Sequence, residues 1–113
     1  MAGVGVDIVE IDRVKNIRLL RRFAEYFLTP MEVAVFDGRI DKVAFIASRF
    51  AAKEATIKAL PGFLSPHDFE TVKIGKKPVV RFLSSAKRGS YEAMVSLSHS
   101  TSYAAGYAIV TKK

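Results

Sequence analysis

The chain has 113 residues, of which 50% are hydrophobic and 26% are charged, and it contains no cysteine. A chain of this length can form one domain with its own core, so we expect a single domain over residues 1–113. No apolar run approaches the roughly 18 residues of a membrane span, and no basic segment precedes an apolar one at the N-terminus. The sequence therefore predicts a soluble, cytoplasmic protein without disulfides or thiolate metal sites.

The charge of the chain is strongly positive, with a formal net charge of +7. This favours an acidic partner, but nucleic acid, an anionic membrane, an acidic protein and a phosphorylated small molecule would all satisfy it. The two histidines, His67 and His99, are too few for a multi-histidine zinc site. Any metal is therefore expected to be a hard cation held by carboxylates, such as magnesium.

The first predicted strand covers residues 3–11, where apolar side chains alternate with small or polar ones. Asp7 falls inside this strand, although aspartate is depleted in strands. Gly5, two residues earlier, leaves room for a ligand or for another backbone. Asp7 is thus either part of a functional site or a strand-end residue that faces water.

An amphipathic helix is predicted over residues 12–27, with Asp12 as its cap. Opposite its apolar side runs a basic stripe of Lys15, Arg18 and Arg22, with Arg21 at its edge. Such a stripe is either a solvated helix face or a docking face for an acidic partner, for which an acidic helix would fit. The residues alone leave both interpretations open.

The longest helical pattern covers residues 41–60 and has a carboxylate, Glu54, on its apolar stripe. A buried carboxylate needs a counter-charge, a proton or a metal ion. The alternative is a surface pair between Glu54 and Lys58 at i,i+4 spacing. A second side of this helix is made of small residues and predicts the close approach of another element. The third side is expected to face solvent and carries Lys42, Arg49, Lys53 and Thr56.

The remaining elements follow from local signals. A capping box at residues 29–32 predicts a short helix that ends near residues 37–38, and Pro61 stops the long helix. The second half is predicted to form two hairpins, and its last strand has a face of small residues that suggests close packing. The four strands are expected at residues 69–74, 78–83, 94–99 and 103–111. Helices followed by antiparallel strands predict an α+β fold.

Asp7 and Glu54 form, together with Lys58, Arg49 and Lys53, a set that suits phosphate chemistry. The carboxylates would hold a magnesium ion that also binds phosphate oxygens, and the cations would neutralise the remaining charge. The two carboxylates are far apart in the sequence. The hypothesis therefore depends on the fold.

Two segments match a known family: residues 3–14, GVGVDIVEIDRV, and residues 48–60, SRFAAKEATIKAL. With them the chain strongly resembles the holo-acyl-carrier-protein synthases, the short bacterial class of 4'-phosphopantetheinyl transferases. The similarity continues through residues 27–33, 68–80 and 96–110. It covers nearly the whole chain and implies the 4'-phosphopantetheinyl transferase fold.

The resemblance implies transfer of the 4'-phosphopantetheine arm of coenzyme A to a serine of apo acyl carrier protein, with release of adenosine 3',5'-bisphosphate. It also implies a role in fatty acid biosynthesis, a homotrimer with active sites at subunit boundaries, and neither nucleic acid nor membrane as a partner. Asp7 and Glu54 match the magnesium ligands of the family. The base that accepts the serine proton is then either Glu54 or a metal-bound water.

By the same resemblance, Glu54, Lys58 and His99 are expected to act in catalysis. Lys58 matches the lysine that contacts the coenzyme A phosphates, and Arg49 and Lys53 lie in the same motif on the nucleotide side. His99 matches a histidine near the nucleotide, although the residues alone make it an ordinary strand residue. The basic helix matches the surface that receives the acidic helix of the carrier protein, with contacts from Arg13, Arg18, Arg21 and Arg22.

The sequence departs from the family pattern after the long helix, where Pro61, Gly62 and Phe63 replace the usual glycines. The turn at residues 75–77 is also short. Both changes bear on the coenzyme contacts.

Two rival functions belong to other classes. A basic nucleic-acid-binding module would explain the charge, but such modules interleave exposed aromatic residues with the basic ones. It also gives no reason for Asp7 and Glu54, which would repel phosphate without a cation. The second rival is an inactive relative that binds carrier protein without transfer.

Overall fold

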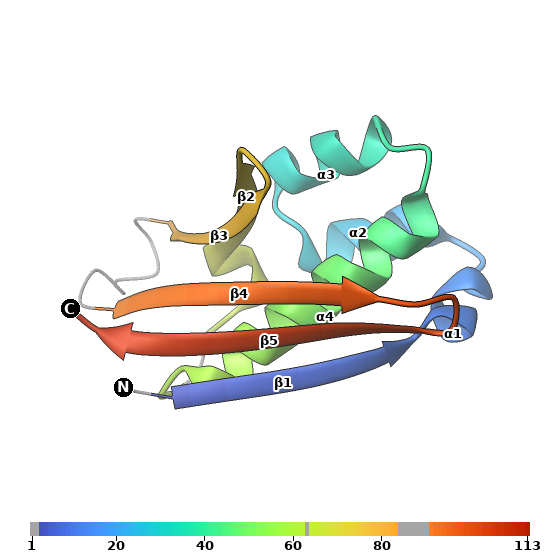
Figure 1. Ribbon diagram of the computed structural model, residues 1–113. Coiled ribbons are helices and arrows are strands. Elements are labelled where there is room, and N and C mark those ends of the chain that lie inside the picture. The colour runs from blue at the N-terminus through green and yellow to red at the C-terminus, as the bar shows by residue number, and fades with distance from the viewer. Residues whose placement is uncertain (1–2, 63, 84–90) are drawn as a thin grey trace.

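The structure, a computed structural model, describes residues 3–62, 64–83 and 91–113. An antiparallel five-stranded sheet in the order β1-β5-β4-β3-β2 packs against the long helix α4 (Figure 1). The strands are β1 (Gly3–Glu10), β2 (Phe69–Ile74), β3 (Lys77–Phe82), β4 (Tyr91–His99) and β5 (Tyr103–Lys112). The helices are α1 (Ile11–Lys15), α2 (Leu20–Phe27), α3 (Pro30–Asp37), α4 (Lys42–Ala59) and the short 3-10 helix η1 (Pro66–Asp68). The predicted α+β fold is confirmed. None of the described helices has the length and apolar character of a membrane span.

Helix α4 approaches the sheet most closely at glycine positions. A Cβ atom on Gly5 would lie 1.9 Å from the carbonyl oxygen of Ala55, and one on Gly106 would lie 2.6 Å from that of Ala51. Both alanines are fully buried. The small side of the helix therefore packs backbone against backbone, as its composition predicted, and the space that Gly5 leaves is filled by α4.

The third side of α4 does not face solvent. Arg49, Lys53 and Thr56 are all buried, so the expectation of a polar surface was wrong for these residues. The reason is that α3, η1 and β2 cover this side. The ammonium group of Lys53 lies 2.7 Å from a carboxylate oxygen of Glu32 in α3 and donates to the carbonyl oxygen of Phe69 at 2.7 Å. Burial lowers the pKa of Lys53.

The predicted helix over residues 12–27 is divided into α1 and α2. The backbone N–H of Ile17 donates to the carbonyl oxygen of Val14 at 3.0 Å, a short-range bond that ends the first helix, and Ile17 then packs against the core. The expected cap was wrong as well, because Glu10 precedes the first turn and Asp12 lies within it. The helical pattern is therefore interrupted at residues 16–19, where the chain turns.

The sheet face opposite α4 is uncovered in the described structure. Figure 1 shows β1, β5 and β4 in front of α4, with no described element in front of them. Large apolar side chains on this face are between 46% and 65% exposed, namely Val4, Val6, Ile8, Met94 and Tyr107. The register pairs Val6 with Tyr107, so the exposed apolar side chains of neighbouring strands form one patch.

Replacing Gly5 by alanine is expected to destabilise the fold, because the new Cβ would collide with the backbone of α4. The free energy of unfolding, measured by urea denaturation, should fall by about 1–3 kcal/mol or more. Gly38→Ala is the matched control, since a Cβ there would lie 3.7 Å from its nearest neighbour atom, in ordinary contact. Its effect should stay within about 0.5 kcal/mol. Equal effects at the two glycines would contradict the close packing.

Candidate functional site

Asp7 lies in β1 opposite Gly106 of β5, on the side of the sheet that faces α4. The ammonium group of Lys58 donates to a carboxylate oxygen of Asp7 at 2.9 Å and to the carbonyl oxygen of Val6 at 3.1 Å. The fold thus joins a strand aspartate to a helix lysine that are distant in the sequence. The Asp7 side chain retains 18% exposure, so it is partly accessible to a ligand.

Glu54 lies one turn before Lys58 on α4 and is half-buried. Residues four apart share one face of a helix, so Glu54 lies on the flank of α4 that reaches β1. Among the described residues, Lys58 forms its ion pair with Asp7 rather than with Glu54. The structure therefore does not contain the simple surface pair between Glu54 and Lys58 among its described residues.

The donor set at this flank fits a hard divalent cation. The described residues contain no group of three or more histidine or acidic side chains that could hold a metal ion. Two carboxylates are nevertheless sufficient for magnesium, which keeps several waters and takes further oxygens from substrate phosphates. Asp7 and Glu54 supply oxygen ligands of the kind that this ion prefers, and the nearby Lys58 adds a second positive charge.

A groove opens beside Asp7, between the end of β1, helix α1 and the long helix. Its apolar lining includes Val14, Ile17, Phe23 and Phe50, and Arg13 lies at its edge. Arg18 and Arg22 are exposed on the adjoining segment. Three of the four predicted docking arginines are therefore available to a partner near the groove.

Arg21, the fourth predicted docking residue, is engaged elsewhere. Its guanidinium group donates to both carboxylate oxygens of Asp37 at 2.9 Å and to Glu25 at 3.0 Å. The bidentate geometry uses the donors that a partner would need. Arg21 thus connects α2 to α3 in this structure.

A second pocket, separate from the groove, contains Arg49 and His99. It lies between the N-terminal half of α4, the β2–β3 hairpin and β4. Sequence reasoning missed four of its cations: Arg39, Lys73, Lys76 and Lys77. The cluster of three lysines around the turn at Gly75 was a usable signal. The composition of the lining suits a ligand with several negative charges.

The predicted site residues are divided between these two places. The groove contains Asp7 and lies on the flank that carries Lys58, whereas His99 and Arg49 line the second pocket. Among the described residues, the groove beside Asp7 is not lined by His99, and the pocket of His99 is not lined by Asp7. Lys53 reaches neither place because its ammonium group is enclosed. Phe63, part of the departure from the family pattern, lies outside the described residues.

A family-wide sequence profile, described as the 4'-phosphopantetheinyl transferase superfamily, matches residues 3–111. The chain belongs to this superfamily. Within it, the chain is 37% identical over 118 residues to the holo-[acyl-carrier-protein] synthase of Clostridium acetobutylicum, covering 96% of this chain and 95% of that protein. The corresponding protein of Desulfovibrio desulfuricans is 39% identical over 122 residues, with 97% of each chain covered. The resemblance inferred from the sequence is confirmed.

Solved structures of superfamily members share the fold. The holo-(acyl-carrier-protein) synthase of Bacillus anthracis, in complex with CoA (3',5'-ADP), has a TM-score of 0.85 and 29% identity, covering 99% of this chain and 97% of that one. The Helicobacter pylori synthase, in complex with coenzyme A, has a TM-score of 0.80 and 29% identity, covering 96% of this chain and 99% of that one.

The engagement of Arg21 makes a prediction about Asp37. Hydrogen bonding and charge from Arg21 lower the pKa of Asp37, so Arg21→Gln should raise that pKa toward the ordinary value for aspartate, about 3.9. The pKa of Asp37 is lower in the folded protein than in the unfolded chain. The pair with Arg21 therefore stabilises the fold fully above the unfolded-state pKa, and this stabilisation is lost as the pH falls through the folded-state pKa. A carboxyl NMR titration measures the shift. Arg22→Gln should leave Asp37 unchanged, and an unchanged Asp37 in Arg21→Gln would mean that Arg21 is free.

Proposed function

We propose that this chain transfers the 4'-phosphopantetheine arm of coenzyme A to a serine of apo acyl carrier protein. The observation that carries the proposal is the contact of Lys58 with Asp7, one turn from Glu54, in a member of the transferase superfamily. Two acids and a cation at one flank suit chemistry on a phosphate anhydride. Such a reaction would supply holo carrier protein for fatty acid biosynthesis in the cytoplasm.

The transfer is a substitution at phosphorus. The serine oxygen forms a bond to the phosphorus of the 4'-phosphopantetheine phosphate while the bond from that phosphorus to the bridging oxygen breaks. The electron pair leaves with adenosine 3',5'-bisphosphate, and the serine proton passes to Glu54 or to water. In such reactions positioning and charge neutralisation supply most of the rate enhancement.

Asp7 and Glu54 are the residues that would hold magnesium. When bound, the ion neutralises charge on the pyrophosphate of coenzyme A and so favours the substitution. Lys58, whose ammonium group already reaches Asp7, would neutralise charge on the phosphate oxygens. Both acids are partly accessible, which supports a ligand role over a purely internal pairing.

The nucleotide part of coenzyme A is assigned in this proposal to the pocket of Arg49 and His99. The lysines of its lining, Lys73, Lys76 and Lys77, complement a bisphosphate, whereas Arg39 of the same lining already donates to both carboxylate oxygens of Asp41 at 2.7 Å. Burial lowers the pKa of Arg49, but a guanidinium group stays protonated in proteins. Lys53 is left out of the proposed contacts because its side chain is only 1% exposed and is bonded to Glu32.

The carrier protein is proposed to dock along the groove beside Asp7. Arg13, Arg18 and Arg22 are exposed there and would attract an acidic helix, while the apolar lining would receive an apolar side chain. Arg21 is omitted, since Asp37 and Glu25 occupy its donors. The position of the groove would bring a carrier serine toward the proposed magnesium ligands.

A homotrimer with sites at subunit boundaries is the proposed assembly. The uncovered apolar patch on the open face of the sheet supports burial against further copies. The separation of His99 from Asp7 within one chain supports a site that two subunits complete. The two observations are independent of each other.

The main test incubates the protein with apo carrier protein, coenzyme A and magnesium, and measures the mass of the intact carrier. The wild type should add one 4'-phosphopantetheine arm. Asp7→Ala and Glu54→Ala should each slow the transfer at least about a hundredfold while remaining folded by circular dichroism. Asp37→Ala, which removes an exposed acid from α3, is the control and should transfer normally. Near-normal turnover by either site variant would refute the metal assignment.

The same assay separates the rival functions. Carrier binding without a gain in mass would identify an inactive relative. RNA binding without carrier affinity would identify a basic nucleic-acid-binding module. Both outcomes would overturn the proposed transfer.

Mixed assembly tests the proposed boundary site. Asp7→Ala and His99→Ala chains, each expected to be inactive alone, are unfolded together and refolded as an equal mixture. Random mixing leaves about one quarter of the boundaries with both native residues, so about a quarter of the wild-type activity should return. Light scattering after size-exclusion chromatography checks the trimer. A trimer without recovered activity would mean that one chain supplies both residues.

A further inference from the structure

The β2–β3 hairpin shares few ladder positions with the long strands among the described residues. Strands β4 and β5 pair along their whole length, whereas β3 pairs with β4 at one described position, Val79 with Met94. Figure 1 shows the hairpin turned away from the three long strands and toward α3. The described ladder therefore constrains the angle of the hairpin little, and the apolar cluster that contains Phe69 and Val80 acts together with the polar contacts at its base.

Buried polar contacts hold the base of the hairpin to the helices. Glu32 of α3 accepts a hydrogen bond from the backbone N–H of Thr71 at 2.8 Å and forms the ion pair with Lys53 of α4. Lys53 in turn donates to the carbonyl oxygens of Phe69 and Pro66. These bonds attach the first residues of β2 to α3 and α4.

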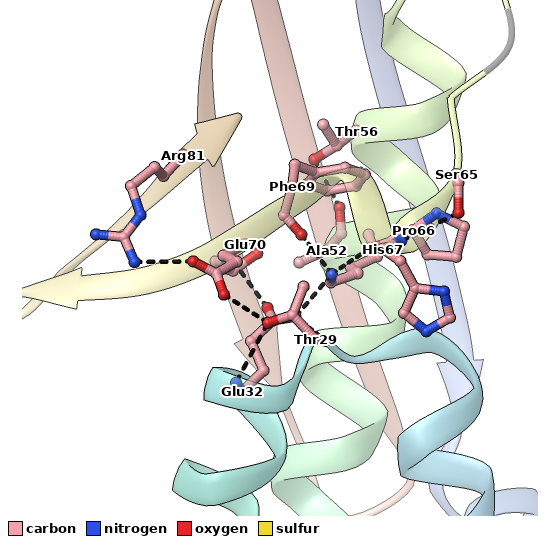
Figure 2. A network of polar contacts seen from close by, with 12 residues as sticks. Thr29, Glu32, Ala52, Thr56, Ser65, Pro66, His67, Phe69, Glu70 and Arg81 are labelled. Atoms are coloured by element: carbon pink, nitrogen blue, oxygen red, sulfur yellow. Dashed lines mark hydrogen bonds and ion pairs between the residues drawn. The ribbon is translucent and has the colours of Figure 1, made fainter. Parts of the chain in front are cut away.

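Glu70 adds the contact that fixes both strands of the hairpin. Figure 2 shows its carboxylate between Thr29 and Arg81. One oxygen accepts from the hydroxyl group of Thr29, the N-cap of α3, at 2.6 Å, and the other accepts from Arg81 of β3 at 2.8 Å. Burial would raise the pKa of Glu70, but the hydrogen bonds from Thr29 and Arg81 outweigh it and lower the pKa. The side chain is therefore ionised at neutral pH.

The far end of the hairpin carries the cations of the second pocket, Lys73, Lys76 and Lys77. Strand β2 has six residues and rises roughly 3.3 Å per residue, so a tilt of about 10° at its base moves its tip by about 3 Å. A binding site tolerates displacements of only about 0.5 Å. Small changes at the base would thus misplace the lysines.

We propose that Glu70 is a positioning residue of the second pocket: by joining Thr29 of α3 to Arg81 of β3, it holds the hairpin lysines at the phosphate groups of the nucleotide. The identity of this ligand rests on the proposed function. Glu70 itself is buried at the base of the hairpin and touches no substrate.

Glu70→Gln is the direct test. A glutamine has one acceptor oxygen, so it cannot serve Thr29 and Arg81 as two carboxylate oxygens do. The KM for coenzyme A should rise about fivefold, while kcat and the KM for carrier protein stay within about twofold of the wild type. Calorimetry with adenosine 3',5'-bisphosphate should show the same loss of affinity without any turnover. Arg81→Ala, at an exposed side chain, provides a second variant should Glu70→Gln fold poorly.

Val110→Ala controls for general loss of stability. Val110 is fully buried in β5 and shares an apolar cluster with Phe69 and Val80 of the hairpin, but it takes no part in the polar contacts of Glu70. It should lower the free energy of unfolding and leave the KM for coenzyme A unchanged. If the KM for coenzyme A rose as much in Val110→Ala as in Glu70→Gln, the effect of Glu70 would come from stability alone, and the proposal would be overturned.

Non-additivity provides the sharpest test. If Glu70 acts through the lysines, Glu70→Gln should have little further effect on the affinity for adenosine 3',5'-bisphosphate in a Lys73→Gln, Lys76→Gln, Lys77→Gln background. Fully additive effects would overturn the positioning role. Wild-type transfer with an unchanged KM in Glu70→Gln would refute this proposal alone, whereas absence of wild-type transfer would refute the proposed function.

Discussion

The close approach of α4 to the glycines of β1 and β5 is the constraint on which the rest of the structure depends. Because a Cβ at Gly5 would lie 1.9 Å from the backbone of Ala55, the helix can lie this close to the sheet only over a glycine. At that height Lys58 reaches the carboxylate of Asp7, and Glu54 follows one turn away. In this position of the helix, another side of α4 faces α3, and Lys53 forms an ion pair with Glu32 there.

Features with a local cause were predictable from the sequence. Both hydrogen bonds of the capping box at Thr29 and Glu32 form as expected, because the partners lie within one turn. The small side of α4 and the small face of the last strand each predicted a closely packed neighbour, and the structure packs these two elements against each other. Asp7 and Glu54 are acids within apolar sequence patterns, and this placement identified both as candidate site residues from the sequence alone.

Features that depend on distant partners were not predictable in this way. Lys53 lies on the polar side of an amphipathic pattern, and only the packing of α3 and β2 encloses it. Arg21 looks like its neighbours in the basic stripe until Asp37 is brought within 2.9 Å. The lysines around Gly75 form a cluster that is visible in the sequence, but their common pocket with Arg49 depends on the position of the hairpin.

The position of β1 has a consequence for the order in which the protein forms. Among the described strands it is an edge strand that pairs with β5, so Asp7 lies opposite Gly106, a residue distant in the sequence. During synthesis the first strand leaves the ribosome early and waits for its partner, and contacts this distant in sequence form slowly. A nascent chain interrupted before β5 would already contain Glu54 and Lys58, yet its Asp7 would lack a paired strand. The contact between Asp7 and Lys58 is thus expected to form late in folding.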